Sequence, residues 1–189
     1  VQELLYVLDA KRYFGSEPLA FLKQVPAIRK SIGLTTEAVR LDWDNTEPVP
    51  GLFHHHWFDV VCAQRTAGGQ YAVEPVLGFS ADWAGIEARE SGAKGNYVRY
   101  MPNDLQLPAR LVDWSRFVRT VVRKRAGQYD RWVFWENPDL AHGSQFIPPA
   151  RYRTMLGAFH KWVSLYDPEA EVVAGGFNMD AALEYLGRI

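Results

Sequence analysis

The feature that most constrains the fold is an alternation between short apolar runs and longer segments whose apolar residues recur at helical spacing. This alternation is typical of βαβ units, in which helices join the strands of a parallel sheet. We expect strands at 4–8, 37–43, 71–77, 131–135 and 171–176, and helices at 21–32, 55–65, 114–122, 152–163 and 181–189. Asp113 is the expected N-cap of the third helix. The sequence therefore predicts an α/β protein of about five β/α units.

Two local features qualify this pattern. Pro75 argues against a regular central position for the third predicted strand, because proline has no N–H to donate. The segment 78–108 that follows is long and irregular, and loops of that length in a compact domain are usually functional.

Composition and charge limit the class of partner. The chain has 189 residues, of which 48% are hydrophobic, enough for a single domain over residues 1–189. Twenty-one basic against 22 acidic residues leave a net charge of -1, which favours neither nucleic acid nor an anionic membrane as partner. Residues 1–6 show no signal-peptide pattern, and no apolar run is long enough for a membrane span. Seven Trp and nine Tyr are a high aromatic load, which either stacks on sugars or fills a core.

The fourth predicted strand carries the most specific motif. It ends in Trp135-Glu136-Asn137-Pro138, which resembles the Trp-Asn-Glu-Pro segment of the clan A retaining (β/α)8 glycosidases. Residues 166–176, an Asp-Pro followed by a Val-rich run and Gly-Gly, resemble the next strand of that clan. Val39-Arg40-Leu41 and 79–84 resemble the second strand and the end of the third. The similarity is greatest to family 39 xylosidases and iduronidases and runs in order along nearly the whole chain.

The resemblance implies that the chain is the N-terminal part of a (β/α)8 barrel. A closed barrel takes about 250 residues and eight strands, so we expect a partial TIM barrel that does not close. Glu136 is the candidate acid/base, and the nucleophile of the clan stands on a seventh strand that we do not expect here. The predicted substrate-binding residues are Arg40, Asp42, Trp43, Trp83, Trp135 and Asn137. The resemblance implies no cofactor and no metal.

One departure from the clan affects the chemistry. Glu136 precedes Asn137 here, whereas the clan has Asn before Glu. Adjacent strand residues point to opposite faces, so without a local shift Asn137 takes the position of the acid. A bulge at the strand end would turn Glu136 back toward the site.

Three other motifs have simpler interpretations. His54-His55-His56 suggests a metal, but no second cluster of ligands has suitable spacing. Gly78-Phe79-Ser80-Ala81-Asp82 imitates the nucleophile elbow of serine hydrolases, with Asp in place of the last Gly. The basic run from Arg119 to Arg125 is most simply a solvated helix face.

Three hypotheses on function remain open at this point. The first is a retaining glycoside hydrolase, the second a barrel that binds carbohydrate without cleaving it, and the third a truncated product without stable function. A carbohydrate is the expected partner, with self-association or a missing C-terminal half of the barrel as further possibilities. The resemblance slightly favours an extracellular or periplasmic location.

Overall fold

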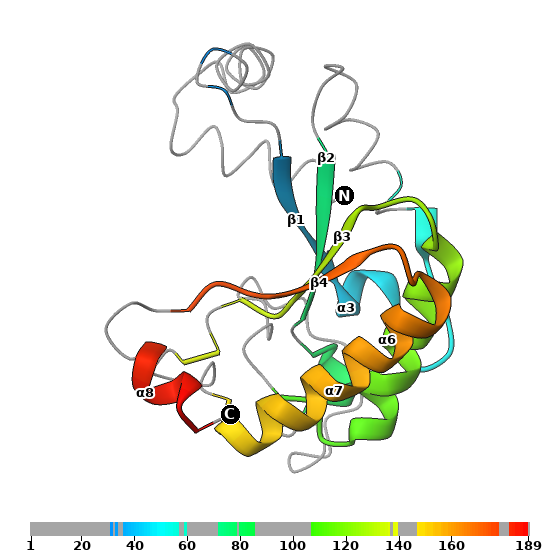
Figure 1. The fold of residues 1–189 in the computed structure, drawn as a ribbon. Coiled ribbons are helices and arrows are strands. Elements are labelled where there is room, and N and C mark those ends of the chain that lie inside the picture. The colour runs from blue at the N-terminus through cyan, green and yellow to red at the C-terminus, as the bar shows by residue number, and fades with distance from the viewer. Residues whose placement is uncertain are drawn as a thin grey trace, which may run out of the picture.

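The computed structural model describes residues 31, 33, 36–56, 59, 72–78, 80–85, 107–136, 138–139, 147–177 and 182–188. Its strands are β1 (Thr36–Asp42), β2 (Ala72–Gly78), β3 (Arg131–Phe134) and β4 (Glu171–Ala174), which form one parallel sheet in the order β1-β2-β3-β4. The helices are α3 (Trp43–Thr46), the 3-10 turn η1 (Asp82–Ala84), α6 (Leu111–Arg125), α7 (Pro149–Tyr166) and α8 (Ala182–Leu186). Figure 1 shows this arrangement. The expected parallel α/β architecture is confirmed.

Four of the five expected strands correspond to β1 to β4, although β3 and β4 end earlier than expected. The expected strand at 4–8 and almost all of the helices expected at 21–32 and 55–65 lie outside the described residues. The described sheet is open, as the partial-barrel prediction requires.

The helix α6 begins before the position that the sequence suggested. Its N-cap is Arg110, without a side-chain cap, and Asp113 lies in its first turn. The Asp113 carboxylate forms an ion pair with Arg110, with 3.1 Å between Arg110 Nε and Asp113 Oδ2. The expectation that Asp113 caps the helix is therefore wrong.

Pro75 lies within β2, which has a neighbouring strand on each side. β2 pairs with β1 along its whole length, but with β3 only at Val76 and Leu77. The pairing with β3 begins directly after Pro75. Proline has no N–H to donate, so leaving Pro75 out of the ladder with β3 costs no hydrogen bond. β2 is therefore a central strand but not a regular one, because its ladder with β3 is shortened at Pro75.

Helices α6 and α7 lie side by side along one face of the sheet (Figure 1). Each presents apolar residues at intervals of three and four, the spacing of one helix face. The buried residues of the two helices are Trp114, Phe117, Val118, Val121 and Val122 of α6, and Tyr152, Met155, Phe159 and Val163 of α7.

Within the part of the chain that the structure describes, no helix is long and apolar enough to cross a membrane.

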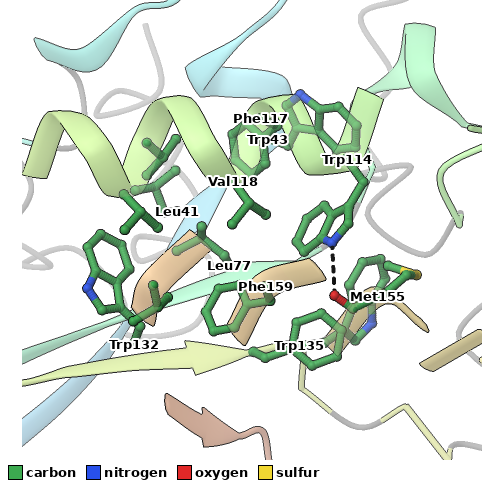
Figure 2. Close-up of a cluster of buried hydrophobic side chains, with 14 of the residues drawn as sticks. Leu41, Trp43, Leu77, Trp114, Phe117, Val118, Trp132, Trp135, Met155 and Phe159 are labelled. Atoms are coloured by element: carbon green, nitrogen blue, oxygen red, sulfur yellow. Dashed lines mark hydrogen bonds between the residues drawn. The ribbon is translucent and has the colours of Figure 1, made fainter. Parts of the chain in front are cut away.

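The core between sheet and helices is unusually aromatic (Figure 2). Trp43 stacks on Phe117 with 4.9 Å between ring centroids, and Trp114 contacts Trp135 at 5.8 Å. Phe134 continues the cluster toward α7 through Phe159, at 5.4 Å. Much of the aromatic load therefore fills the core, the second of the two uses that composition allowed.

Asp167 connects the end of α7 to the neighbouring strand. Its buried carboxylate accepts hydrogen bonds from Trp132 Nε1 at 2.8 Å and from the Gly127 N–H at 2.9 Å. The Asp-Pro segment that resembled the glycosidase clan thus has a structural role here, since it fixes α7 against the turn before β3.

The opposite face of the sheet carries charge. Arg131 donates to Glu171 at 2.8 Å and to Glu74 at 3.3 Å, across three strands. Val76 and Val133 lie on this face, but Val39 and Val172 belong to the helix-covered core.

Candidate functional site

The carboxyl ends of the strands meet at one edge of the sheet because all four strands are parallel. β1 ends at Asp42, β2 at Gly78, β3 at Phe134 and β4 at Ala174. In barrels of parallel strands, binding and catalytic groups gather at this edge. We call these strand ends and the residues directly after them the carboxyl rim.

Arg40 and Asp42 form an ion pair on β1, with 3.1 Å between Arg40 Nη2 and Asp42 Oδ1. Both side chains are about one-third exposed, at 38% and 31%, so they remain accessible to a ligand. The sequence also predicts that Arg40 and Glu136 come within hydrogen-bond reach of each other, directly or through one water. Both residues lie toward the same edge of the sheet, and that contact stays a prediction.

Trp43 and Trp135 are buried, which corrects their expected role. Trp43 has no exposed surface, and its indole Nε1 donates to Glu47 at 2.7 Å. Trp135 is 2% exposed and packs against Trp114. A sugar needs an open ring face to stack on. Neither tryptophan offers one, because α6 contributes the aromatic side chains that cover them.

The backbone leaves the strand conformation at Trp135. This residue has a φ of 42°, in the left-handed region that side chains rarely adopt. Its N–H still donates to Leu77 O at 2.9 Å, while the Gly175 N–H donates to Phe134 O at 2.7 Å. A Cβ at Gly175 would overlap the carbonyl oxygen of Trp135, and one at Gly78 would lie 3.3 Å from its Cα. Two glycines on the neighbouring strands thus make room for the turn.

Glu136 follows this turn directly. It lies at a bend on the carboxyl rim, and its side chain is half-buried. The left-handed residue before it interrupts the alternation of side chains along β3. Asn137 lies outside the described residues. Glu136 therefore retains its candidacy as the rim carboxylate, and the order of Glu136 and Asn137 alone does not exclude it.

Trp83 is the predicted binding tryptophan that keeps an exposed part. It lies on η1, directly beyond the end of β2, and is half-buried. Its Nε1 donates to Glu47 O at 2.8 Å, and the Arg116 guanidinium lies 5.6 Å from its ring centroid. Trp43 packs edge-on against it, at 5.5 Å. The ring is held on several sides, which reduces the entropy lost when a ligand stacks on it.

Glu47 is a structural residue that sequence reasoning missed. Its fully buried carboxylate accepts from Trp43 Nε1 at 2.7 Å, from the Gly51 N–H at 2.6 Å and from Arg116 Nη2 at 2.6 Å. Two of these donors lie four residues from Glu47, one on either side, whereas Arg116 comes from α6, 69 residues further along the chain. No local pattern around Glu47 indicates this role, because the charge that compensates it comes from α6.

A second buried cluster lies just beyond Glu136. Asp139 and Tyr152 are both buried, and the Tyr152 hydroxyl has no hydrogen-bond partner among the described residues. Tyr185 donates from its hydroxyl to Ile147 O at 2.6 Å. Burial, followed by the charge of Asp139, raises the pKa of Tyr152 above its usual range. The Tyr152 phenol therefore stays protonated over the whole physiological range of pH.

The motifs with simpler interpretations add no catalytic group. Among the described residues, no three His, Cys, Asp or Glu side chains come together where they could hold a metal ion. Ser80 is buried, and a 3-10 turn follows it in place of the long helix that a nucleophile elbow requires. Arg125 is also buried, bonded to Asp59 and to His55 O. For Arg125 the expectation of a solvated helix face is wrong.

Comparison with known proteins gives a fold but no sequence family. No protein-family model and no curated protein sequence matches the chain. Solved structures do match, at low identity. A family 39 glycoside hydrolase from Bacteroides cellulosilyticus WH2 gives a TM-score of 0.54 at 18% identity, over 82% of this chain and 28% of that one. Endo-glycoceramidase II from Rhodococcus sp. gives 0.55 at 14% identity, over 81% and 43%.

An exo-β-1,4-mannosidase from Opitutaceae bacterium strain TAV5 gives 0.54 at 16% identity, over 82% of this chain and 28% of that one. The chain shares the fold of part of these structures, which is that of an incomplete (β/α)8 barrel. It spans 28% to 43% of the length of these structures. The resemblance found at residues 131–139 and 166–176 is thus confirmed at the level of fold. In this fold, the carboxyl rim is the edge at which Arg40, Trp83 and Glu136 lie.

Proposed function

We propose that the chain forms the carbohydrate-binding rim and supplies the acid/base of a retaining glycoside hydrolase, with Glu136 as that acid/base. The observation that carries the proposal is the left-handed turn at Trp135. This turn follows the end of β3, and Glu136 comes directly after it on the carboxyl rim. Arg40, Asp42 and Trp83 lie at the same edge of the sheet. The energetic cost of the turn supports a functional interpretation, because strained residues that are held by their surroundings cluster at active sites.

The chemistry assigns a distinct part to each rim residue. Glu136 donates its proton to the leaving oxygen and later takes one from water. Arg40 hydrogen-bonds to carboxylate or sugar hydroxyl groups, and Trp83 stacks on a sugar ring. A retaining mechanism needs a second carboxylate about 5–5.5 Å from the first. The resemblance assigns that carboxylate to a seventh strand, which is not among the four described.

Hydrolysis of aryl glycosides by the intact protein tests the role of Glu136. The variant Glu136→Gln should lower the rate about 10²- to 10⁴-fold for a leaving group that needs protonation. The kcat/KM for 2,4-dinitrophenyl glycosides should change little, because that leaving group departs without a proton. For both substrates kcat/KM is the quantity to compare, since kcat also falls when hydrolysis of the glycosyl-enzyme lacks its base. Glu184→Gln, on the exposed α8, is the matched control and should leave both rates unchanged. Equal losses on both substrates would show that Glu136 is not the acid/base.

A barrel that binds carbohydrate without cleaving it is the second candidate function. It is favoured by the order of Glu136 and Asn137, since Asn cannot protonate a leaving group. The double variant Glu136→Asn with Asn137→Glu restores the order of the clan. If the natural protein only binds, this variant should gain hydrolysis, whereas a natural hydrolase should lose it.

A further inference from the structure

A groove with a volume of about 420 Å³ lies along α6 and borders the carboxyl rim at Arg116, whose guanidinium is 5.6 Å from the Trp83 ring centroid. It is lined by His55, Arg116, Arg119, Thr120, Arg123 and Lys124. Four of these six side chains are cationic and none is acidic. A protein with a net charge of -1 thus concentrates positive charge along one helix face.

The carboxylates near the groove neutralise only part of this charge. Glu47 pairs with Arg116, and Asp59 pairs with Arg125 beneath the groove. Arg119 donates to the Tyr166 hydroxyl at 3.3 Å and lies 5.4 Å from the Trp162 ring centroid. Arg123 and Lys124 are exposed, and neither forms an ion pair with another described residue. These two residues provide the uncompensated positive charge of the groove.

Two buried nitrogens of the groove residues are unsatisfied. His55 Nδ1 and Arg116 Nε have no hydrogen-bond partner among the described residues, although both atoms are shielded from solvent. Buried polar atoms normally have a partner, so such orphans require an explanation. Burial, followed by the charges of Arg125 and Lys124, lowers the pKa of His55, while Asp59 opposes the shift. The electrostatic environment of His55 is therefore positive.

We propose that this groove binds a sulfate or phosphate group, free or carried as an ester by a small molecule. Guanidinium groups bind tetrahedral oxyanions through paired N–H donors, and lysine adds a point charge. The donors that can reach the anion are the exposed N–H groups of Arg123 and Lys124, because His55 Nδ1 and Arg116 Nε are shielded from solvent. The volume accommodates the anion together with a group about as large as one sugar ring.

Calorimetric titration with sodium sulfate and sodium phosphate, at ionic strength held constant with sodium chloride, tests the proposal. Both anions should bind, and the double variant Arg123→Gln with Lys124→Gln should weaken binding at least tenfold. Arg153→Gln, an exposed arginine on α7, is the matched control and should not change it. Thermal unfolding of each variant verifies the fold. Absence of saturable binding, or equal binding by both variants, would overturn the proposal.

The source of the anion is tested with glucosamine 6-sulfate and glucose 6-phosphate. If one of them binds more tightly than its inorganic ion, the site takes that ester; if neither does, it takes the free anion. NMR titration of His55 gives an independent readout, because a bound anion favours the imidazolium. The pKa of His55 should rise on addition of sulfate, against the charges of Arg116, Arg119, Arg123, Lys124 and Arg125 and beside Asp59. An unchanged His55 pKa at saturating sulfate would place the anion elsewhere and contradict the proposal.

Discussion

At the scale of single residues, Trp135 and Gly175 depend on each other. The Trp135 turn brings its carbonyl oxygen to where a Cβ of residue 175 would be, so only glycine fits there. Gly175→Ala should therefore destabilise the protein by about 3 kcal/mol or more, because backbone must move on two strands. Gly176→Ala, with nothing within 4 Å of its Cβ, should stay within about 0.5 kcal/mol. Urea unfolding measures both, and equal effects would contradict the turn.

Removal of the side-chain hydroxyl should have opposite effects on stability at Tyr152 and at Tyr185. The Tyr152 hydroxyl is buried without a partner among the described residues, so Tyr152→Phe should be neutral or stabilise by about 1 kcal/mol. Tyr185→Phe removes the bond to Ile147 O and should cost about 1 kcal/mol. The same unfolding experiment distinguishes them, and a clear loss of stability in Tyr152→Phe would reveal a partner for its hydroxyl.

The raised pKa values of the same two tyrosines predict how the stability of the protein depends on pH. The pKa of Tyr152 and Tyr185 is raised in the folded state, chiefly by burial, so folding favours the protonated phenols. Their contribution is complete below the ordinary tyrosine pKa of about 10 and is lost as the pH rises toward the folded value. The free energy of unfolding should thus fall above about pH 10, and less steeply in Tyr152→Phe. Identical slopes would show that Tyr152 ionises normally.

At the scale of elements, Glu47 holds the segment after β1 against α6. Glu47→Ala removes the acceptor of Trp43 Nε1, the Gly51 N–H and Arg116 together. We expect a loss of about 3 kcal/mol, since buried donors are left unsatisfied. Glu184→Ala breaks the exposed Arg188 pair on α8 and should cost less than about 0.5 kcal/mol. Comparable losses in the two variants would show that the Glu47 network contributes little.

The elements themselves were largely predictable from sequence, and the reason is periodicity. The apolar spacing that runs through Trp114 and Phe117 fixes α6 whatever its neighbours are, and the same holds for α7. The start of α6 was missed because Asp113 pairs with Arg110 and does not cap. The expected ends of β3 and β4 lie one and two residues too far along the chain, beside the turn at Trp135.

The candidate site was predictable only in part. The sequence placed Glu136 at the carboxyl rim because it follows a parallel strand, β3. It placed Arg40 on β1, which is two strands away from β3 in the sheet. The burial of Trp43 and the function of Glu47 were not predictable, because both depend on Phe117 and Arg116, about 70 residues further along the chain. Residues of that kind become evident only when packing is known.

At the scale of the whole molecule, the open sheet has a consequence for association. Among the described residues β4 pairs only with β3, and Val172 and Val173 at this edge are half-exposed. An unpaired strand edge is a template for pairing with another chain. We predict that the 189-residue chain self-associates, observed by size-exclusion chromatography with light scattering. Val173→Lys should restore the monomer, and a monodisperse wild-type monomer would contradict the prediction.

The most direct test of the central claim, a carbohydrate-binding carboxyl rim, is binding to a soluble glycan array, followed by titration with the best ligand. The wild-type chain should bind, Trp83→Ala should lose at least tenfold in affinity, and Trp83→Phe should retain most of it because an aromatic face remains. Trp162→Ala removes a tryptophan of similar burial from the contact between α7 and α6, where its Nε1 donates to Ser115, and should leave the affinity for a neutral glycan unchanged. Absence of binding to any glycan, or an equal loss in Trp83→Ala and Trp162→Ala, would contradict the account.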